Sequence, residues 1–229
     1  MIRLSLSGRA LLARVLLAAT LLACGGCGAR ADGKLRVRAG HFPNITHAQG
    51  VLGHATGRFQ QALGERATVE WKVFNAGPSA IEAIFAGDLD LTYIGPNPAV
   101  NGHVRSHGEA LRIVAGGCSG GAGLVVRAWV AEHVRITDWI NANRDEAARL
   151  VNEEIRRETG AALPASILQP AFARLELTDD PVPASLVTSA RQAHELGFLG
   201  RGRVDLAGIY DLRFLNEARA AAHKAPVTP

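Results

Sequence analysis

The sequence has few cysteines, and this limits the covalent cross-links that the chain can form. Only 3 cysteines occur in 229 residues. Two of them, Cys24 and Cys27, lie close together near the N-terminus, and the third, Cys118, stands alone. This number and spacing give no disulfide framework. We therefore expect the fold to depend on a packed core, with Cys118 as a small buried residue.

The sequence also lacks a strongly basic surface, long charge runs and low-complexity tracts. The formal net charge of +4 includes three arginines that precede Cys24, where no acid occurs, so it falls to +1 without them. No basic stripe with interleaved aromatic residues remains, and this excludes nucleic acid as an expected partner. The 48% hydrophobic content supports a sizeable core.

Beyond the first two dozen residues, no stretch is long and apolar enough to span a membrane. The N-terminus itself is predicted to be a signal peptide over residues 1–23, because Arg3 and Arg9 precede a nearly unbroken apolar run from Ala10. The run ends in LLAC, which resembles a bacterial lipobox and predicts lipidation of Cys24. Cleavage by an ordinary signal peptidase near Ala29 or Ala31 is the alternative. Either processing event predicts an exported, periplasmic protein, with the lipid as a membrane anchor in the first case.

What the sequence does contain is an alternation of short strands and helices. This pattern predicts an α/β fold with a mainly parallel sheet and helices on its faces. The predicted strands are 35–40, 68–75, 89–93, 111–115 and 124–126, and the predicted helices among them run over 47–63, from 79 to Gly87, and from 97 to about 106. After residue 127 the pattern becomes helical, with segments at 129–140, 144–159, 165–175, 184–196 and 206–222.

Two predicted helix starts follow two successive strands within residues 75–100. Ser79 with Glu82 matches a capping box, and Asn97 followed by Pro98 matches an N-cap with proline at the first helical position. In a parallel sheet both helices would begin at the same edge, with free N–H groups turned toward it. Such an edge suits an anion.

The four loops at the predicted carboxyl edge of the sheet are polar but uncharged. They are 43–47, 75–79, 95–97 and 117–121, and none contains lysine or arginine. Ligands of parallel sheets bind at this edge. The sequence therefore predicts an anion site built from neutral N–H and hydroxyl donors together with helix dipoles.

A serine hydrolase is the enzymatic alternative. Residues 117–121 fit the pattern G-x-S-x-G with Ser119 as nucleophile, and a later acid and histidine exist at Asp179 or Asp205 and at His194 or His223. A nucleophile elbow requires a helix directly after the serine, whereas a strand-like segment follows here. The same glycine-rich run lacks the Gly-Lys-Ser/Thr ending of a P-loop, so nucleotide binding is not expected.

No cofactor and no metal site are predicted. His103 and His107 lie four residues apart in a predicted helix, but no third ligand is evident, and a solvated polar face is the simpler interpretation. The many charged residues between Arg144 and Glu158 are likewise interpreted as a solvated helix face.

Several stretches resemble the substrate-binding proteins of ABC importers for aliphatic sulfonates, nitrate and taurine, which have a type 2 periplasmic binding protein fold. The matching segments are AGHFPNITHAQ, FNAGPSAIEAIFAGDLDLTYIGPNPAVNG, LRIVAGGCSGGAGLVVR and TDWINANRDEAARLVNEEI. The resemblance implies a non-catalytic protein that passes a small anion to an ABC permease. The ligand-binding residues that it implies are Asn44, Thr46, His47, Ser79, Asn97, Ser119 and Gly120. It also places His41 where relatives often have an aromatic residue of the pocket.

The family fold has two α/β lobes, and the resemblance implies that this chain has mainly one. Residues 33–127 match the first lobe, while residues 128–222 match late helices that would pack on it. Roughly 100 residues, about a domain, would be missing at a junction near residue 127. A single lobe leaves the ligand open to water and cannot close on it, so weak or unmeasurable solute affinity is expected. An inactive, truncated binding protein is the further alternative.

Overall fold

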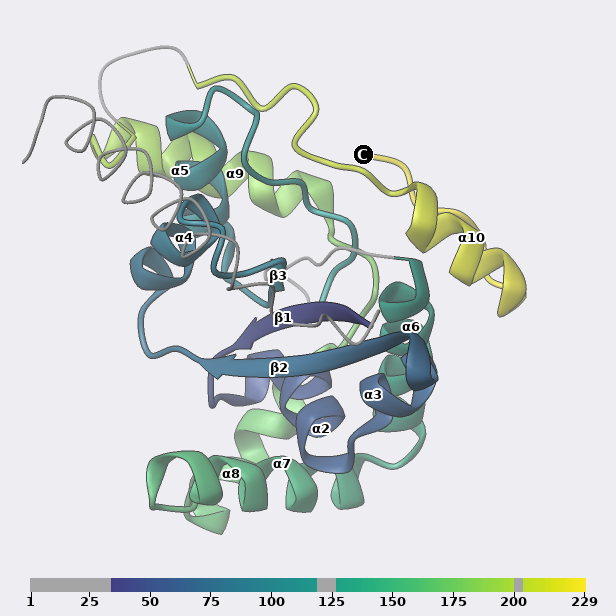
Figure 1. The fold of residues 1–229 in the computed structure, drawn as a ribbon. Helices are drawn as coiled ribbons and strands as arrows, with labels where there is room; N and C mark the ends of the chain where they lie inside the picture. The colour runs from purple at the N-terminus through teal and green to yellow at the C-terminus, as the bar shows by residue number, and fades with distance from the viewer. Residues whose placement is uncertain (1–33, 119–126, 200–203) are drawn as a thin grey trace, which may run out of the picture. The chain divides into compact units, whose positions relative to one another are not determined.

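The computed structural model describes residues 34–118, 127–199 and 204–229. Residues 35–229 belong to one compact unit, built around a three-stranded parallel sheet in the order β2-β1-β3 (Figure 1). The strands are β1 (Leu35–His41), β2 (Ala67–Val73) and β3 (Leu91–Thr92). The first three predicted strands are therefore confirmed. The predicted signal peptide with Cys24, and the predicted site residues Ser119 and Gly120, lie outside the described residues.

The central strand β1 pairs with both of the other strands and sets their register. β1 pairs with β2 along its whole length, from Leu35 with Ala67 to His41 with Val73. The short β3 is extended by two further hydrogen bonds to β1, from the Asp90 N–H to the Arg38 carbonyl and from the Tyr93 N–H to the Gly40 carbonyl. The three strands therefore end together, and this positions the loops that follow them.

One face of the sheet is covered by the helices that follow β1. These are the 3₁₀ turn η1 (Ile45–His47), α2 (Ala48–Thr56) and α3 (Arg58–Leu63), followed by a second 3₁₀ turn, η2 (Gly64–Arg66). The single helix predicted over 47–63 is wrong. Gly57 adopts a left-handed conformation with φ of 66°, which ends α2 and begins α3 in a new direction.

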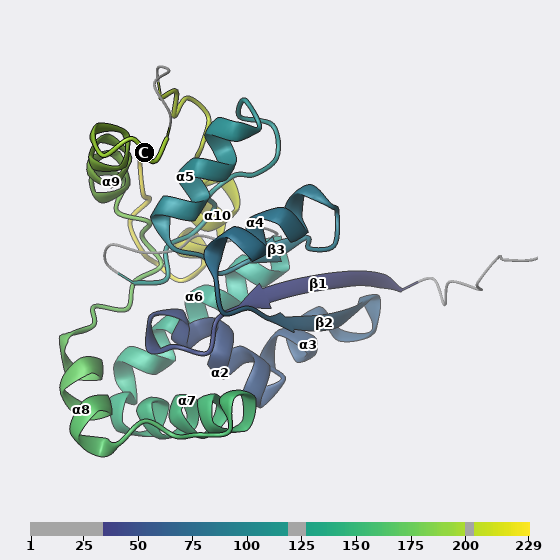
Figure 2. The ribbon, with the colours of Figure 1, turned by 90° about the vertical axis from the view of Figure 1, so that its left-hand side faces the viewer.

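The other face is covered by α4 (Gly77–Phe85) and α5 (Pro96–Arg105), with α9 (Pro183–Glu195) against α5 (Figures 1 and 2). On the first face, α7 (Arg144–Thr159) packs against α2 and carries α8 (Ala165–Arg174) beside it. The helix α6 (Arg127–Ala142) contacts α2 and α3, and α10 (Arg213–Ala221) packs on α6. All five predicted late helices are present, although α10 is shorter than predicted.

Two apolar clusters correspond to the two faces. The larger joins β1, β2, α2 and α3 to α6, α7 and α10, and the smaller joins α4, α5 and α9. Trp129 anchors the larger cluster, with only 1% of its surface exposed and its ring stacked on that of Phe59 at a centroid distance of 3.9 Å. Cys118 is buried, as predicted.

One predicted strand is absent from the sheet. The predicted strand 111–115 does not join the sheet, because Ile113 forms only an isolated parallel bridge with Tyr210. At the C-terminal end, Val227 is buried and its backbone forms two hydrogen bonds with the side chain of Asn216. Across the described part of the chain, no helix has the length and apolar character needed to cross a membrane.

Candidate functional site at the carboxyl edge of the sheet

Three loops meet where β1, β2 and β3 end, and we call residues 42–47, 74–79 and 94–98 the rim. The ring of Phe42 lies 6.2 Å from that of Phe74, which joins the first loop to the second. Gly77 lies so close to Pro98 that a Cβ at this position would come within 3.0 Å of the proline ring, which joins the second loop to the third. The two helix starts therefore lie side by side, as the sequence predicts.

The beginning of the fourth predicted loop is attached to the same region. The side-chain amide of Gln49 in α2 donates a hydrogen bond of 2.6 Å to the Gly117 carbonyl. Nε2 of His133 in α6 donates another of 2.6 Å to the Gly116 carbonyl, and Nδ1 of the same ring accepts from the Tyr93 hydroxyl at 3.1 Å. These buried contacts hold Gly116 and Gly117 beside the residues that precede the third loop.

The first rim loop is ordered by its own side chains. Oδ1 of Asn44 accepts hydrogen bonds from the N–H and the hydroxyl of Thr46, at 3.1 and 2.6 Å, and caps η1. Asn44 is exposed and Thr46 half-buried. His47 is buried, and its Nδ1 accepts from the Phe42 N–H at 3.3 Å. Because Nδ1 is an acceptor, the ring carries its proton on Nε2.

Burial, with a smaller contribution from nearby His41, lowers the pKa of His47 to about 3. The imidazole is therefore neutral at physiological pH. It adds a neutral ring to the rim and no positive charge, which agrees with a site built from uncharged donors.

The start of α4, in the second rim loop, differs from its prediction. Ser79 is exposed and lies inside the first turn of α4, where its hydroxyl donates to the Ala76 carbonyl at 2.7 Å. Ala76 is the N-cap residue and makes no side-chain cap, so the predicted Ser79–Glu82 capping box is wrong. The helix begins earlier because Gly77-Pro78 supplies a favourable first turn.

The start of α5, in the third rim loop, also lies earlier in the chain than predicted. α5 begins at Pro96, with Gly95 as its N-cap, so the predicted capping role of Asn97 is wrong. Asn97 is instead an exposed residue of the first turn. Pro96 and Pro98 have no N–H group, which leaves the N–H of Asn97 as a free donor of this turn, since the Ala99 N–H bonds to the Gly95 carbonyl.

A mostly apolar pocket begins at the rim and follows α5. It has a volume of about 390 Å³ and is lined by residues of α4 and α5 and, across from them, by residues of α9 and the segment after it: Pro78, Ile81, Asn97, Pro98, Asn101, Arg105, Ala193, Phe198 and Leu199. Among the described lining residues the one charged side chain is that of Arg105, which lies at the far end of α5 and pairs with Glu82 at 2.8 Å. The pocket offers apolar surface next to the exposed amide of Asn97.

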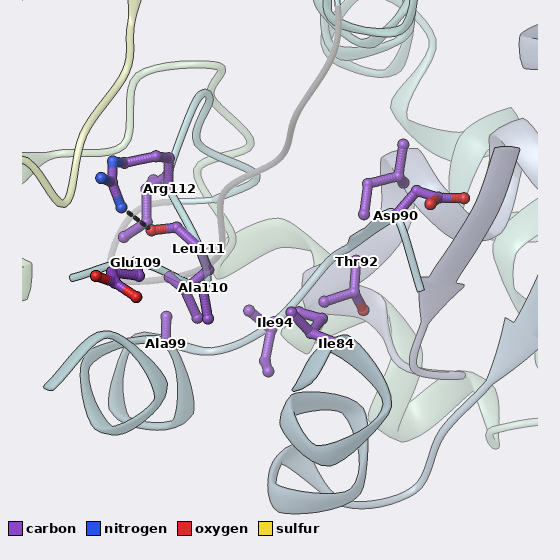
Figure 3. Close-up of a pocket in the computed structure, with 11 residues that line it drawn as sticks. Ile84, Asp90, Thr92, Ile94, Ala99, Glu109, Ala110, Leu111 and Arg112 are labelled. Atoms are coloured by element: carbon purple, nitrogen blue, oxygen red, sulfur yellow. Dashed lines mark hydrogen bonds between the residues drawn. The ribbon is translucent and has the colours of Figure 1, made fainter. Parts of the chain in front are cut away.

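A second cavity, of about 420 Å³, lies between β3 and residues 109–113, where the fourth strand had been predicted (Figure 3). Two of its charged residues, Asp90 and Arg112, already have hydrogen-bond partners. Asp90 forms hydrogen bonds of 2.6 and 3.0 Å with Arg38, and Arg112 donates to the backbone carbonyl of Leu111 at 2.8 Å. The cavity also contains the carboxylates of Asp90 and Glu109, which would repel an anion, so we do not assign the anion to it.

Two interpretations of charged and metal-binding residues are corrected. His107 lies beyond the end of α5 with φ of 52°, so it does not share a helix face with the buried His103. The expected solvated face of α7 is wrong for Glu154 and Glu158, whose side chains are each only 5% exposed. Both lie near His54 of α2, and no local sequence pattern indicates this contact because the partners are about 100 residues apart.

His41 does not reach the rim either. Its side chain is fully buried and lies 3.1 Å from both His54 and Glu158. The role in the pocket that the resemblance implied for this position is therefore wrong. Of the acids weighed for a serine hydrolase, Asp179 is buried in ion pairs with Arg219 and Lys224, and Asp205 accepts from the Ala207 N–H.

The buried His133 should make the free energy of unfolding depend on pH in the acid range. Burial lowers its pKa to about 4, although its hydrogen bond to Gly116 and nearby Asp179 oppose the shift and Lys224 reinforces it. Between pH 6.5 and 4 the unfolded chain binds more protons at this position than the folded protein does. The free energy of unfolding should therefore fall on acidification through this window, by about 2–3 kcal/mol.

Urea denaturation at several pH values checks this expectation. His133→Gln should reduce the slope between neutral pH and about pH 4, with the remaining slope belonging to the buried His47, whereas His107→Gln, at an exposed position, should leave it unchanged. A wild-type stability that stays constant over the window, or an equal slope in His133→Gln, would contradict the assignment.

Comparison with known proteins gives likeness at the level of structure only. No family model and no curated protein matches the chain. The alkanesulfonate-binding protein SsuA from Xanthomonas axonopodis pv. citri, bound to MOPS, aligns with a TM-score of 0.57 and 13% identity, covering 80% of this chain and 100% of that one. The periplasmic aliphatic sulphonate binding protein SsuA from Escherichia coli gives 0.55 and 13%, covering 77% and 92%.

A third structure agrees with these two. The ligand-binding component of an ABC-type import system from Staphylococcus aureus, with zinc bound, aligns with a TM-score of 0.58 and 9% identity over 81% of this chain and 99% of that one. The chain therefore has an α/β fold like that of periplasmic binding proteins. Its described residues form one small parallel sheet with flanking helices, and residues 127–229 add helices rather than a second sheet. The predicted deletion near residue 127 stays a prediction.

Proposed function

We propose that the protein is a solute-binding component of an ABC importer and that its rim binds a small anion such as an aliphatic sulfonate, taurine or nitrate. The observation that carries the proposal is the juxtaposition of the starts of α4 and α5 at the end of a parallel sheet, with Gly77 against Pro98. The first loop, with Asn44, Thr46 and His47, lies beside them through the contact of Phe42 with Phe74.

The affinity should be low. Each helix start contributes about 0.3–1 kcal/mol to the binding of an anion at an exposed position. Neutral hydrogen bonds add about 0.5–1.5 kcal/mol each. Such sums correspond to dissociation constants of about 0.1–10 mM, far from the roughly 8 kcal/mol that micromolar binding needs.

The apolar pocket along α5 favours an anion with an alkyl group over an inorganic anion. Its apolar lining begins at Asn97, so an anionic group at the start of α5 would place a short alkyl tail against Pro98 and Ile81. Burial of each methylene group contributes about 0.8 kcal/mol. We therefore expect ethanesulfonate to bind more tightly than nitrate.

Calorimetry of the purified protein with ethanesulfonate, taurine and nitrate at constant ionic strength tests the proposal. Asn97→Asp should weaken ethanesulfonate binding at least tenfold, because a carboxylate about 4 Å from the anion repels it by several kcal/mol at an effective dielectric constant of about 20. The substitution should not weaken the fold, since an acid in the first turn of a helix is favourable.

The matched control is Asn143→Asp, which places the same charge at the start of α7, outside the rim. Its binding should equal that of the wild type. Sub-micromolar sulfonate binding would contradict the open, low-affinity site, and an absence of binding by all three anions would favour an inactive, truncated binding protein. Labelling of Ser119 by a fluorophosphonate would instead favour the hydrolase.

The export route and partner belong to the same proposal. A signal peptide over 1–23 with a lipid on Cys24 would hold the protein at the periplasmic face of the inner membrane, where a permease could accept the solute. Radiolabelled palmitate incorporation tests the anchor, with Cys24→Ala expected to abolish it. Cys27→Ala is the matched control and should leave incorporation unchanged.

A further inference from the structure

We propose that His41, His54 and Glu158 form a binding site for a divalent transition-metal ion, best fitted to Zn²⁺, that fastens α7 to the sheet. The three residues come from β1, α2 and α7, and their ligand atoms all lie within 4.8 Å of one another. They are the one group of this kind among the residues that the structure describes. The inference rests on this cluster alone and is independent of the proposed solute binding.

The geometry of the cluster is that of a metal site. Nε2 of His41, Nδ1 of His54 and Oε1 of Glu158 form a triangle in which every side is 3.1 Å. Zinc bonds of about 2.0–2.1 Å in a tetrahedral arrangement place the ligand atoms roughly 3.3 Å apart. Two imidazoles and one carboxylate are also a ligand set that Zn²⁺ takes in proteins.

Hydrogen bonds alone cannot satisfy all three atoms of this triangle. If both histidines donate to the Glu158 carboxylate, two N–H groups face each other across the 3.1 Å contact between the rings. If one histidine instead donates its N–H to the other, the accepting ring has no proton on the nitrogen that faces Glu158. The lone pair of that nitrogen then faces the carboxylate oxygen. A metal ion bound by all three lone pairs removes this conflict.

The carboxylate gives a second, separate indication of a ligand. The side chain of Glu158 is 5% exposed, and its Oε2 is buried without a hydrogen bond to any residue of the described ranges. A buried carboxylate oxygen without a partner is costly, and bidentate binding of a metal would satisfy it. Glu154 also lies 3.3 Å from Nδ1 of His54, but Arg157 donates hydrogen bonds to both of its carboxylate oxygens, so a water molecule would complete the four-coordinate site.

The surroundings hold the ligands in place and give the site a route to solvent. The ring of Trp71 stacks on His54 at 5.0 Å and meets His41 edge-on at 5.3 Å, so both imidazoles have a fixed orientation. His41 is fully buried, whereas the side chain of His54 is 22% exposed, so an ion can enter from the α2 side. The bound metal would tie the strand before the first rim loop to a helix more than 100 residues later.

Titration of the metal-free protein with Zn²⁺ against a chromogenic chelator tests the proposal. We expect one Zn²⁺ per chain with a dissociation constant below about 1 µM, and a rise in Tm of roughly 5–10 °C at a hundredfold excess over that constant. Co²⁺ in place of Zn²⁺ should give the intense visible absorption of a four-coordinate site.

His54→Gln and Glu158→Gln should each weaken Zn²⁺ binding at least 100-fold and remove the rise in Tm. His103→Gln changes another buried histidine outside the cluster and should bind as the wild type does. Circular dichroism of the metal-free variants checks folding, and Glu158→Gln keeps the shape of the side chain if His54→Gln does not fold. Wild-type binding weaker than about 100 µM, or undiminished binding in both variants, would overturn the proposal.

Discussion

Asp179→Ala is expected to lower the free energy of unfolding by about 3–5 kcal/mol, because it leaves a partly buried cation without its partner. The carboxylate of Asp179 is 4% exposed and pairs with Arg219, whose side chain is 15% exposed. It also lies 3.5 Å from Nζ of Lys224, which pairs with Asp138 of α6. The Asp179 carbonyl accepts from the Gly116 N–H, so the network joins α10, α6 and the segment around Gly116.

Urea denaturation of single and double variants measures this effect. Asp179→Leu combined with Arg219→Met should be much less destabilising than either substitution alone, because no uncompensated charge remains. Glu153→Ala removes an exposed ion pair with Arg149 and is the control, with an expected loss below about 1 kcal/mol. A loss below 1 kcal/mol for Asp179→Ala as well would show that Arg219 finds water or another partner.

Trp129→Ala is the second change with a large expected effect, again about 3–5 kcal/mol. Trp129 joins α6 to α3 and β2, since its ring stacks on Phe59 of α3 and lies 5.2 Å from Trp71 of β2. The cavity left by alanine would lie between the buried ring of Phe59 and the partly buried ring of Trp71, which limits its collapse.

The comparison with Trp139→Ala makes this prediction specific. Trp139 lies in the same helix but is only partly buried, with Arg58 over its ring at 5.6 Å, so its loss should cost clearly less. Both variants should denature in a single transition if the helices from α6 onward and the sheet with its flanking helices form one cooperative unit. Equal effects, or a separate transition for the helices, would contradict the packing described for α6.

Local sequence patterns predicted where helices occur better than they predicted the residue at which each helix begins. The helix predicted over 144–159 ends as expected, because Gly160 supplies the left-handed conformation that stops it. The predicted caps at Ser79 and Asn97 failed because Gly77-Pro78 and Gly95-Pro96 begin each helix earlier. Proline's preference for the first helical turn, applied before the search for capping boxes, would have corrected both.

The remaining errors involve partners that are distant in sequence. Ile113 lies in an apolar run that reads as a strand, but its bridge is made with Tyr210, almost 100 residues later. Glu158 belongs to a charged helix and looks solvated until α7 packs on α2 and brings it to His54. No local pattern carries this information, since tertiary contacts decide it.

The most direct test of the central claim, that the helix starts at the rim form one anion site, is a ¹H–¹⁵N NMR titration of the protein with ethanesulfonate. The backbone amide signals of Thr46, Ser79 and Asn97 are predicted to shift together and to saturate with a single dissociation constant. Shifts spread over unrelated surfaces, or amides of the two helix starts that respond with different constants, would contradict a common site.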